Sequence, residues 1–516
     1  MGVMRRRGFL ASCAVTAGSL ALLESASAAQ AGKPRPGATT SLKTSVTRTG
    51  RDRPNVLLIM TDQQRGDCLG IDGHPVLLTP TMDRIAGQGV RFVHAYTSCP
   101  SCIAARRSLL SGQFPATHGM RGYRDGVEWD APPTLPQVLK EDGYHTCLVG
   151  RTMHQYPTRK RYGYDHMVIH KGEDGDYEEW LSRRQPEGSG GYYGTGVMHN
   201  DWTARPWHMP EAYHKTNWTV NQALEFLRKR DPSCPFFLTV SFLAPHPPLI
   251  PPAPYMERYL RTDLPEPVIG DWATPPENNG LGMGQSTSRV HLTGEALRSA
   301  RAAYYGLINH VDDQINRLLN PVNGVDSMTG GNTIVIFTAD HGEMLGDHYR
   351  WRKTLPYEPS ARIPLLIRPP RRSGIAAGKV VEQAACLEDI MPTVLSMVGI
   401  APPETVEGMS LLPLMRGEDA EARPYIHIEH APIHHTLTDG KEKFIWFVED
   451  GSEQFFRLSE DPNELHDLAA DAKHADRVAH WRGLLVKELA NRPEGFSDGE
   501  SLVPGVPYPA VYASDA

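Results

Sequence analysis

The sequence has 516 residues but only 7 cysteines, and this scarcity narrows the classes of protein to which it can belong. Disulfide scaffolds and zinc ribbons need cysteines at dense, regular spacing. Beyond Cys13, cysteines stand at positions 68, 99, 102, 147, 234 and 386, which fits neither class. Cys99 and Cys102 form a Cys-x-x-Cys pair, but no thioredoxin-like pattern surrounds it, so a redox pair is disfavoured.

The chain also has no surplus of positive charge, no internal repeat and no long apolar run after its N-terminus. Its formal net charge is -7, and it has no basic helix or RNA-binding motif, which disfavours binding to nucleic acid. No later stretch is long and apolar enough for a transmembrane helix. With 40% hydrophobic and 22% charged residues, the composition is that of a globular protein with a large core.

The N-terminus has the pattern of a signal peptide. The run Arg5-Arg6-Arg7-Gly8-Phe9-Leu10 precedes a short apolar stretch, and Ala26-Ser27-Ala28 resembles a cleavage site. The paired arginines before Phe9-Leu10 are typical of twin-arginine export. We therefore predict a signal peptide at residues 1–28, a flexible leader at 29–53, and a periplasmic or secreted protein.

Continuous apolar runs predict strands that are buried on both faces, as in a mostly parallel sheet. These runs are residues 55–61, 146–149, 236–242 and 333–338. Helical patterns lie between them at 80–86, with Thr79 as the expected N-cap and Pro80 in the first position, and at 131–143 and 295–319. The segment 171–214 is rich in Gly, Tyr and Trp without periodicity, and is expected to be an insertion over the ligand crevice.

After about residue 422 the pattern changes to short alternating runs at 425–428, 444–448 and 454–458, followed by a helical pattern at 476–489. The turn pairs Asp439-Gly440 and Asp450-Gly451 separate the runs. The predicted fold class is therefore α/β: a large, mostly parallel sheet sandwiched by helices at 54–421, and a smaller C-terminal antiparallel α+β subdomain at 422–516.

Each predicted strand ends near polar residues, and the carboxyl ends of parallel strands meet at one edge of the sheet. Asp62 and Asp340 are the best candidates for metal ligands, although each alone could be a helix N-cap. With Gln63 and His341 beside them, an oxygen-rich site becomes more probable, and oxygen ligands suit Ca²⁺ or Mg²⁺. Such an ion would act as a Lewis acid.

Cys102 opens the run Cys102-Ile103-Ala104-Ala105-Arg106, which leads into Ser108-Leu109-Leu110-Ser111-Gly112. A single cysteine is most often a small buried thiol. This run, however, resembles the motif of the type I sulfatases, in which the cysteine is converted to formylglycine. The resemblance extends over most of the chain. Further stretches stand in the family's order: 54–63, 114–119, 244–246, 338–348, 363–366 and 456–464.

The resemblance implies a role for each matching residue. Cys102 would be the formylglycine nucleophile and a metal ligand, with Asp62, Gln63, Asp340 and His341 completing the metal shell around Ca²⁺, or else Mg²⁺ or Mn²⁺. Arg106 would hold the formylglycine hydrate, and Lys353 would contact the sulfate. His246 would protonate the leaving oxygen, and His154 with Arg151 would remove a proton when the sulfate is released. Without the family, His246 would be interpreted as a turn residue.

The resemblance implies a hydrolase for aryl or carbohydrate O-sulfate esters, matured by a formylglycine-generating or a radical-type enzyme. Three departures stand out. Ala104 replaces the more frequent proline. His341 replaces the usual asparagine and is shared with branches that hydrolyse phosphonate monoesters and phosphodiesters. One extra residue leaves the pairing of Arg151 and His154 with the family pattern ambiguous. The alternatives are a phosphonate monoester or phosphodiester hydrolase, and a non-catalytic binder of sulfated glycans if Cys102 is unmodified.

The inserted segment carries aromatic and histidine side chains whose roles the sequence leaves open. Its aromatic residues could stack on a sugar ring, but such residues more often pack a loop. These aromatic residues are Tyr192, Tyr193, Trp202 and Trp207. His199, His208 and His214 are expected to be solvated.

Overall fold

The computed structural model describes residues 53–170, 175–277, 287–420 and 423–512. The predicted signal peptide and all of the predicted leader except Arg53 lie outside the described residues. Among the described residues, every helix is too short or too polar to cross a membrane.

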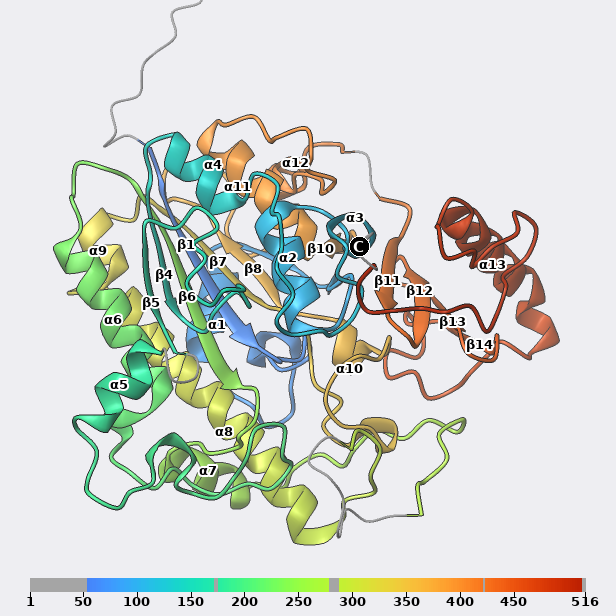
Figure 1. Ribbon diagram of the computed structural model, residues 1–516, viewed down its shortest axis with the longest axis horizontal. Helices are drawn as coiled ribbons and strands as arrows, with labels where there is room; N and C mark the ends of the chain where they lie inside the picture. The colour runs from blue at the N-terminus through green and yellow to red at the C-terminus, as the bar shows by residue number, and fades with distance from the viewer. Residues whose placement is uncertain (1–52, 171–174, 278–286, 421–422, 513–516) are drawn as a thin grey trace, which may run out of the picture. The chain divides into compact units, whose positions relative to one another are not determined.

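An eight-stranded sheet forms the centre of the fold, in the order β5-β4-β6-β1-β7-β8-β2-β9 (Figure 1). β8 pairs antiparallel with both of its neighbours, and the remaining pairings are parallel. The predicted mostly parallel sheet is therefore confirmed. The strands are β1 (Asn55–Asp62), β2 (Val90–Phe92), β4 (His145–Gly150), β5 (His166–Ile169), β6 (Phe236–Pro245), β7 (Thr333–Ala339), β8 (Leu365–Arg368) and β9 (Lys379–Val381), and a separate pair joins β3 (Ala95–Tyr96) to β10 (Ala385–Cys386).

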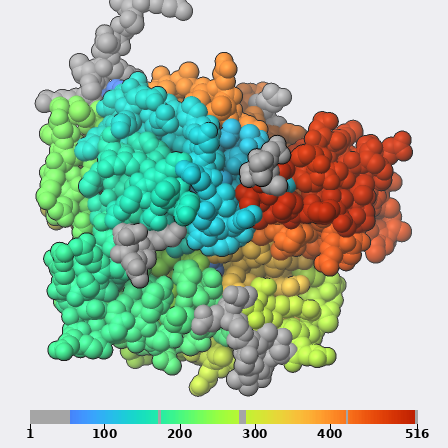
Figure 2. Space-filling model, in the orientation of Figure 1, coloured from blue at the N-terminus to red at the C-terminus, as the bar shows by residue number. Residues whose placement is uncertain are grey.

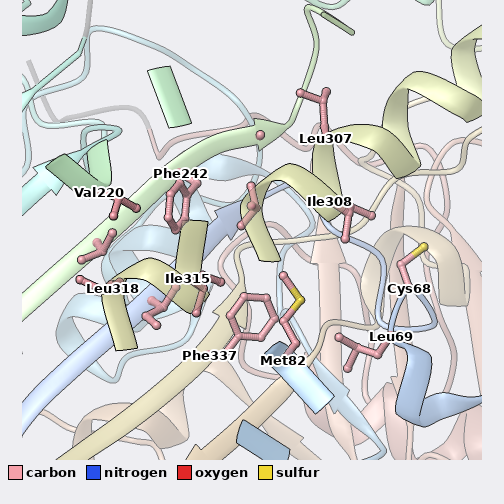
Figure 3. Close-up of a cluster of buried hydrophobic side chains, with 14 of the residues drawn as sticks. Cys68, Leu69, Met82, Val220, Phe242, Leu307, Ile308, Ile315, Leu318 and Phe337 are labelled. Atoms are coloured by element: carbon pink, nitrogen blue, oxygen red, sulfur yellow. The ribbon is translucent and has the colours of Figure 1, made fainter. Parts of the chain in front are cut away.

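Helices cover both faces of this sheet, which explains why its central strands are apolar throughout. Leu57 and Ile59 of β1 point into one core, with α1 (Pro80–Gly87), α6 (Lys215–Lys229) and α8 (Gly294–Leu319). Figure 3 shows that core, where Ile315 and Leu318 of α8 lie near Phe337 of β7. Alternate residues of β1 enter a second core on the opposite face, with α2 (Cys102–Ser111), α4 (Leu135–Glu141) and α11 (Ile390–Val398).

The helical predictions differ from the structure at their ends. Helix α8 begins one residue before the predicted 295, whereas α4 is shorter than the predicted 131–143 because Thr134 caps its N-terminus by accepting a hydrogen bond from the Gln137 N–H. Thr79 does not cap α1, since its hydroxyl bonds the Gly70 N–H and the Asp83 carboxylate instead. The other helices are α3 (Pro115–His118), α5 (Asp176–Ser182), α7 (Ala253–Leu260), α9 (Val325–Thr329), α10 (Glu358–Ala361), α12 (Leu412–Arg416) and α13 (Ala475–Leu489).

The C-terminal part forms a four-stranded antiparallel sheet in the order β11-β12-β13-β14, with α13 packed on it. Its strands are β11 (Ile426–His430), β12 (His434–Thr438), β13 (Lys443–Phe447) and β14 (Glu453–Phe456). The predicted antiparallel subdomain is therefore confirmed. Strand β12 was not predicted, because its residues, His434 to Thr438, are mostly polar.

The described part of the inserted segment packs around its own small core. Tyr177, Tyr192 and Trp207 are buried there with Trp218 of α6. The backbone of the insert pairs with the chain that follows β6, through the bonds from the N–H groups of 205 and 207. Its teal-to-green surface forms part of the face in Figure 2. For Tyr192 and Trp207, this packing supports the loop-packing interpretation over sugar stacking.

Candidate active site

The carboxyl ends of four adjacent strands build the site. In the sheet β4, β6, β1 and β7 lie side by side, so the residues that follow them come together at one edge. Asp62 ends β1, Asp340 follows β7, Arg151 follows β4 and His246 follows β6. Residues separated by almost 300 positions thus meet because the strands that carry them are neighbours.

Two aspartates form the base of the site, and one arginine orients both. Asp62 and Asp340 are fully buried, and Arg106 of α2 donates from Nη2 to Asp62 Oδ2 and from Nε to Asp340 Oδ2, each at 3.0 Å. Arg106 also donates to Ser241 Oγ at 3.0 Å and to the Thr152 carbonyl at 3.1 Å. The second oxygen of Asp62 faces the centre of the site, 3.7 Å from Cys102 Sγ.

Burial alone would raise the pKa of Asp62. The effect of burial is outweighed by the positive charges of Arg151, His246 and Arg106, and the pKa of Asp62 lies well below its ordinary value. The surrounding cations therefore favour the ionised form of this carboxylate. An ionised carboxylate held rigidly by arginines is suited to bind a cation through its other oxygen.

Cys102 is the first residue of α2 and is buried, with an exposed fraction of 2%. Its Sγ lies 3.2 Å from His341 Nε2 and 3.3 Å from Lys353 Nζ. Burial and Asp62 raise the pKa of this thiol, but Lys353 and His341 outweigh them, and the net shift is downward. The N-terminus of α2 adds a partial positive charge, which favours an anion at this position.

His341 presents a ring nitrogen to the same centre. Its Nδ1–H donates to the Gly342 carbonyl at 3.0 Å, so the neutral ring directs the Nε2 lone pair toward Cys102 and Asp340. Burial lowers the pKa of His341, but Asp340 and Cys102 raise it more, and the net shift is upward. The site therefore attracts a proton or a metal ion to this nitrogen. Gly342 must be glycine, because a Cβ there would collide with the Pro359 carbonyl.

The ligand atoms of Asp62, Cys102, Asp340 and His341 all lie within 4.8 Å of one another, which is the spacing that a single metal ion requires. Gln63 adjoins them, with its Oε1 accepting a hydrogen bond from Lys353 Nζ at 2.8 Å. Carboxylate and amide oxygens at this density match a hard divalent cation.

Glu343 contacts the site residue Gln63, and the sequence patterns had assigned no role to it. It accepts a hydrogen bond from Gln63 Nε2, and its other oxygen accepts the N–H groups of Leu345 and Arg352. Glu343 thereby links Gln63 to the segment that carries Lys353. The signal available in the sequence was an acid in the run Asp340-His341-Gly342-Glu343, directly after a strand. Ser241, which bonds Arg106, was detectable only as a small polar residue within an apolar strand.

His246 lies beside Asp62, with its backbone N–H donating to the Asp62 carbonyl at 3.1 Å. Its Nδ1–H donates to the Pro247 carbonyl at 2.6 Å, which leaves Nε2 to exchange a proton. Burial, with Lys353 and His199, lowers the pKa of His246 well below its ordinary value. The ring of His199 stacks on it, with centroids 4.5 Å apart and planes at 26°.

The prediction that His199 and His214 are solvated is wrong. His199 is half-buried, and burial together with Arg151 and Lys353 lowers its pKa to about 3. His214 has an exposed fraction of 1% and caps α6 by accepting the Thr216 N–H, so it belongs to the core. His208 is exposed, as predicted. Periodicity could not find these roles, because the segment has none.

Arg151 and His154 flank the pair of aspartates. Arg151 forms an ion pair with Asp62 through Nε, and its Nη2 lies 3.4 Å from His154 Nε2. Both residues therefore lie at the site, although the chain has one residue more between them than the family pattern. Every residue predicted for the site thus lies at this edge of the sheet, while the role of each one stays a prediction.

Comparisons with known proteins agree with this geometry. The family model described as Sulfatase matches residues 54–400, and the model described as N-sulphoglucosamine sulphohydrolase, C-terminal, matches residues 346–491. An arylsulfatase of Clostridium perfringens is 41% identical over 88% of this chain and 98% of that protein. A choline-sulfatase of Rhizobium meliloti is 28% identical over 83% of this chain and 87% of that protein. The crystal structure of the phosphonate monoester hydrolase of Agrobacterium radiobacter aligns with a TM-score of 0.73 at 26% identity, covering 85% of this chain and 96% of that chain.

Proposed function

We propose that this chain, which belongs to the sulfatase family, is an exported enzyme that cleaves aryl or carbohydrate O-sulfate esters with a formylglycine made from Cys102. That the chain is a sulfuric ester hydrolase follows from its matches. The proposal that Cys102 becomes a formylglycine rests on the position of this residue. Cys102 lies at the N-terminus of α2, and its Sγ is within 4.8 Å of the ligand atoms of Asp62, Asp340 and His341.

The donor set fits a divalent cation. Asp62, Gln63, Asp340, His341 and residue 102 would hold it, and we propose Ca²⁺, with Mg²⁺ or Mn²⁺ as alternatives. When bound, such an ion draws in a sulfate oxygen and stabilises the charge that develops on it, while the hydrated formylglycine supplies the attacking hydroxyl.

The remaining side chains bind the substrate and move protons. Lys353 Nζ, placed between Gln63 Oε1 and residue 102, pairs with the sulfate. Arg106 holds both carboxylates and keeps their charge fixed during the reaction. His246 Nε2 protonates the leaving oxygen. Since the pKa of His246 is depressed in the free protein, the bound sulfate anion is needed to favour its protonated form. His154, next to Arg151, takes up a proton when sulfate is released.

The decisive test is the mass of the tryptic peptide that contains residue 102, from protein made with a formylglycine-generating or radical-type maturation enzyme. Conversion to the aldehyde lowers the mass of this peptide, whereas ordinary oxidation raises it. We expect the lowered mass together with turnover of p-nitrophenyl sulfate, and loss of both in Cys102→Ala. An unmodified peptide with undiminished turnover would refute the proposal. An unmodified peptide with binding of sulfated glycan and no turnover would favour a binding protein.

A phosphonate monoester or phosphodiester hydrolase is the second candidate. It is favoured by His341, whose Nε2 faces the site, and by the aligned structure of a phosphonate monoester hydrolase. Measuring kcat/KM for p-nitrophenyl sulfate and for a phosphonate monoester, with the same preparation, separates the two. A clear preference for the phosphonate would replace the sulfatase proposal.

Export by the twin-arginine route and the division at residues 421 and 422 are also proposals. Export is supported by the sequence of residues 1–28. The match to the C-terminal family model spans residues 346–491, so that model begins before the proposed division.

A further inference from the structure

A buried cluster of charges lies where the C-terminal sheet meets the segment that leads from Lys353 to α10. Lys443 of β13 is fully buried. Its Nζ contacts Glu464 Oε1 at 2.7 Å, Glu358 Oε1 at 2.9 Å and the Pro356 carbonyl at 2.9 Å. The ammonium group donates hydrogen bonds to Glu464 and to the Pro356 carbonyl, and its contact with Glu358 is an ion pair.

Glu464 connects this cluster to the backbone. It is fully buried at the end of the run 456–464, which the sequence matches to the family but which the active site does not explain. One carboxylate oxygen binds Lys443, and the other accepts the Glu358 N–H at 2.8 Å. The Glu464 carbonyl accepts Trp272 Nε1–H at 2.8 Å, which fixes the turn itself.

The segment held in this way carries Lys353. No helix or strand covers residues 350–357, so their conformation depends on individual contacts. At Thr354 the segment is fixed by a bond from its N–H to the Pro100 carbonyl at 3.1 Å. Further on, Lys443 of β13 binds the Pro356 carbonyl, and Gln454 of β14 accepts the Tyr357 hydroxyl at 2.8 Å. Glu464, which follows the sheet, accepts the Glu358 N–H.

The energetic cost of burying these charges indicates that the cluster fixes the position of the backbone rather than stabilising the fold. Burying an ammonium group and two carboxylates costs desolvation energy that their attraction barely offsets, so well-packed apolar residues would stabilise the fold as well or better. A bidentate carboxylate that binds both a buried ammonium and a backbone N–H instead specifies one position of the chain. The backbone that it specifies lies three to five residues after Lys353, the residue that contacts Gln63 and Cys102.

We propose that Glu464 is a positioning residue for catalysis: through Lys443 and the Glu358 N–H it fixes the segment that places the Lys353 ammonium against Gln63 and residue 102. The inference rests on the proposed function only in that Lys353 must act in turnover. It gives the C-terminal subdomain a part in the chemistry, although none of its residues need touch the substrate.

The test compares Glu464→Gln with Glu460→Gln in the full-length, matured enzyme. Glu460 is a matched control, because it lies in the same turn but is exposed and pairs only with Arg457 in the described structure. A glutamine at 464 keeps the shape but removes the charge, and its single amide oxygen can accept from Lys443 or from the Glu358 N–H but not from both. We expect kcat/KM for p-nitrophenyl sulfate to fall about ten- to a hundredfold in Glu464→Gln, the scale expected for a displaced catalytic group. Glu460→Gln should match the wild type.

The decisive measurement is made in a Lys353→Ala background. If Glu464 acts through Lys353, adding Glu464→Gln to Lys353→Ala lowers kcat/KM no further. Losses that multiply would overturn the inference and leave a purely structural role. Tyr357→Phe, which removes the bond to Gln454 without touching a buried charge, should show a smaller loss that is again absent in the Lys353→Ala background, and it carries the test if Glu464→Gln does not fold. Failure of the proposed function is distinct, since the wild type itself would then not turn over the sulfate ester.

Discussion

Replacing Arg106 by lysine tests whether this arginine holds the two buried aspartates together. Arg106 makes two charge-assisted bonds, to Asp62 and Asp340, and two further bonds, to Ser241 and Thr152. A lysine keeps the charge but cannot span both carboxylates, so the change loses one charge-assisted bond of about 1.5–3 kcal/mol and two others of about 1 kcal/mol each. The total, about 3.5–5 kcal/mol, agrees with the cost of leaving one buried charge without its partner.

Arg107→Lys is the matched control for this substitution. Arg107 is the next residue of α2, is also buried, and donates to the Val127 carbonyl while its guanidinium lies 5.0 Å from the Trp129 ring. Urea unfolding followed by tryptophan fluorescence, with a chelator present so that no cation compensates for the lost bonds, gives the free energy of unfolding. We expect Arg106→Lys to lose about 2–4 kcal/mol more than Arg107→Lys. Equal losses in the two variants would refute the role assigned to Arg106.

Three further results are expected. His199→Ala exposes His246, whose depressed pKa is due mainly to burial, so the limb of the pH profile of kcat/KM assigned to His246 should move to higher pH. His199→Phe should restore the original position of this limb. A limb that does not move in His199→Ala contradicts the stacking role. Burial and Arg107 lower the pKa of His118 to about 3, so the unfolded chain takes up the proton first, and the contribution of His118 to stability falls by about 1.4 kcal/mol per unit as pH drops below about 6.5. His118→Gln should reduce the fall in stability between pH 7 and pH 5, measured by urea titration, by this one contribution, and an unchanged fall would place the titration elsewhere. Chelation should abolish turnover, and it should lower Tm because a bound ion stabilises only the folded state. Added Ca²⁺ should restore both. Full activity in the presence of the chelator would exclude the metal proposal.

The sequence predicts the framework well because the relevant signals are local. Continuous apolar runs such as 55–61 reveal strands buried on both faces, and the polar residue after each run falls at the shared edge of the sheet. The family motifs then identify which polar residues to group. Asp62 and Asp340 could be paired for this reason before their distance was known.

The missed features depend on contacts between distant segments. Glu343 is an ordinary acid in a loop until folding places it against Gln63. His199 lies in an insert with no periodicity, and its half-burial arises because the insert packs beside His246. The residues of β12 are largely polar, so this strand gains its identity from pairing with its neighbours β11 and β13.

The 2% exposure of Cys102 has a consequence for the order of folding and of the proposed modification of this side chain. The ten residues of α2 are all buried in the folded protein, so a modifying enzyme could not reach the Cys102 side chain there. The proposed conversion of this side chain therefore requires the polypeptide to be open, as it is during or soon after synthesis. Under that proposal, the fraction of active enzyme would depend on the rate of modification relative to the rate of folding.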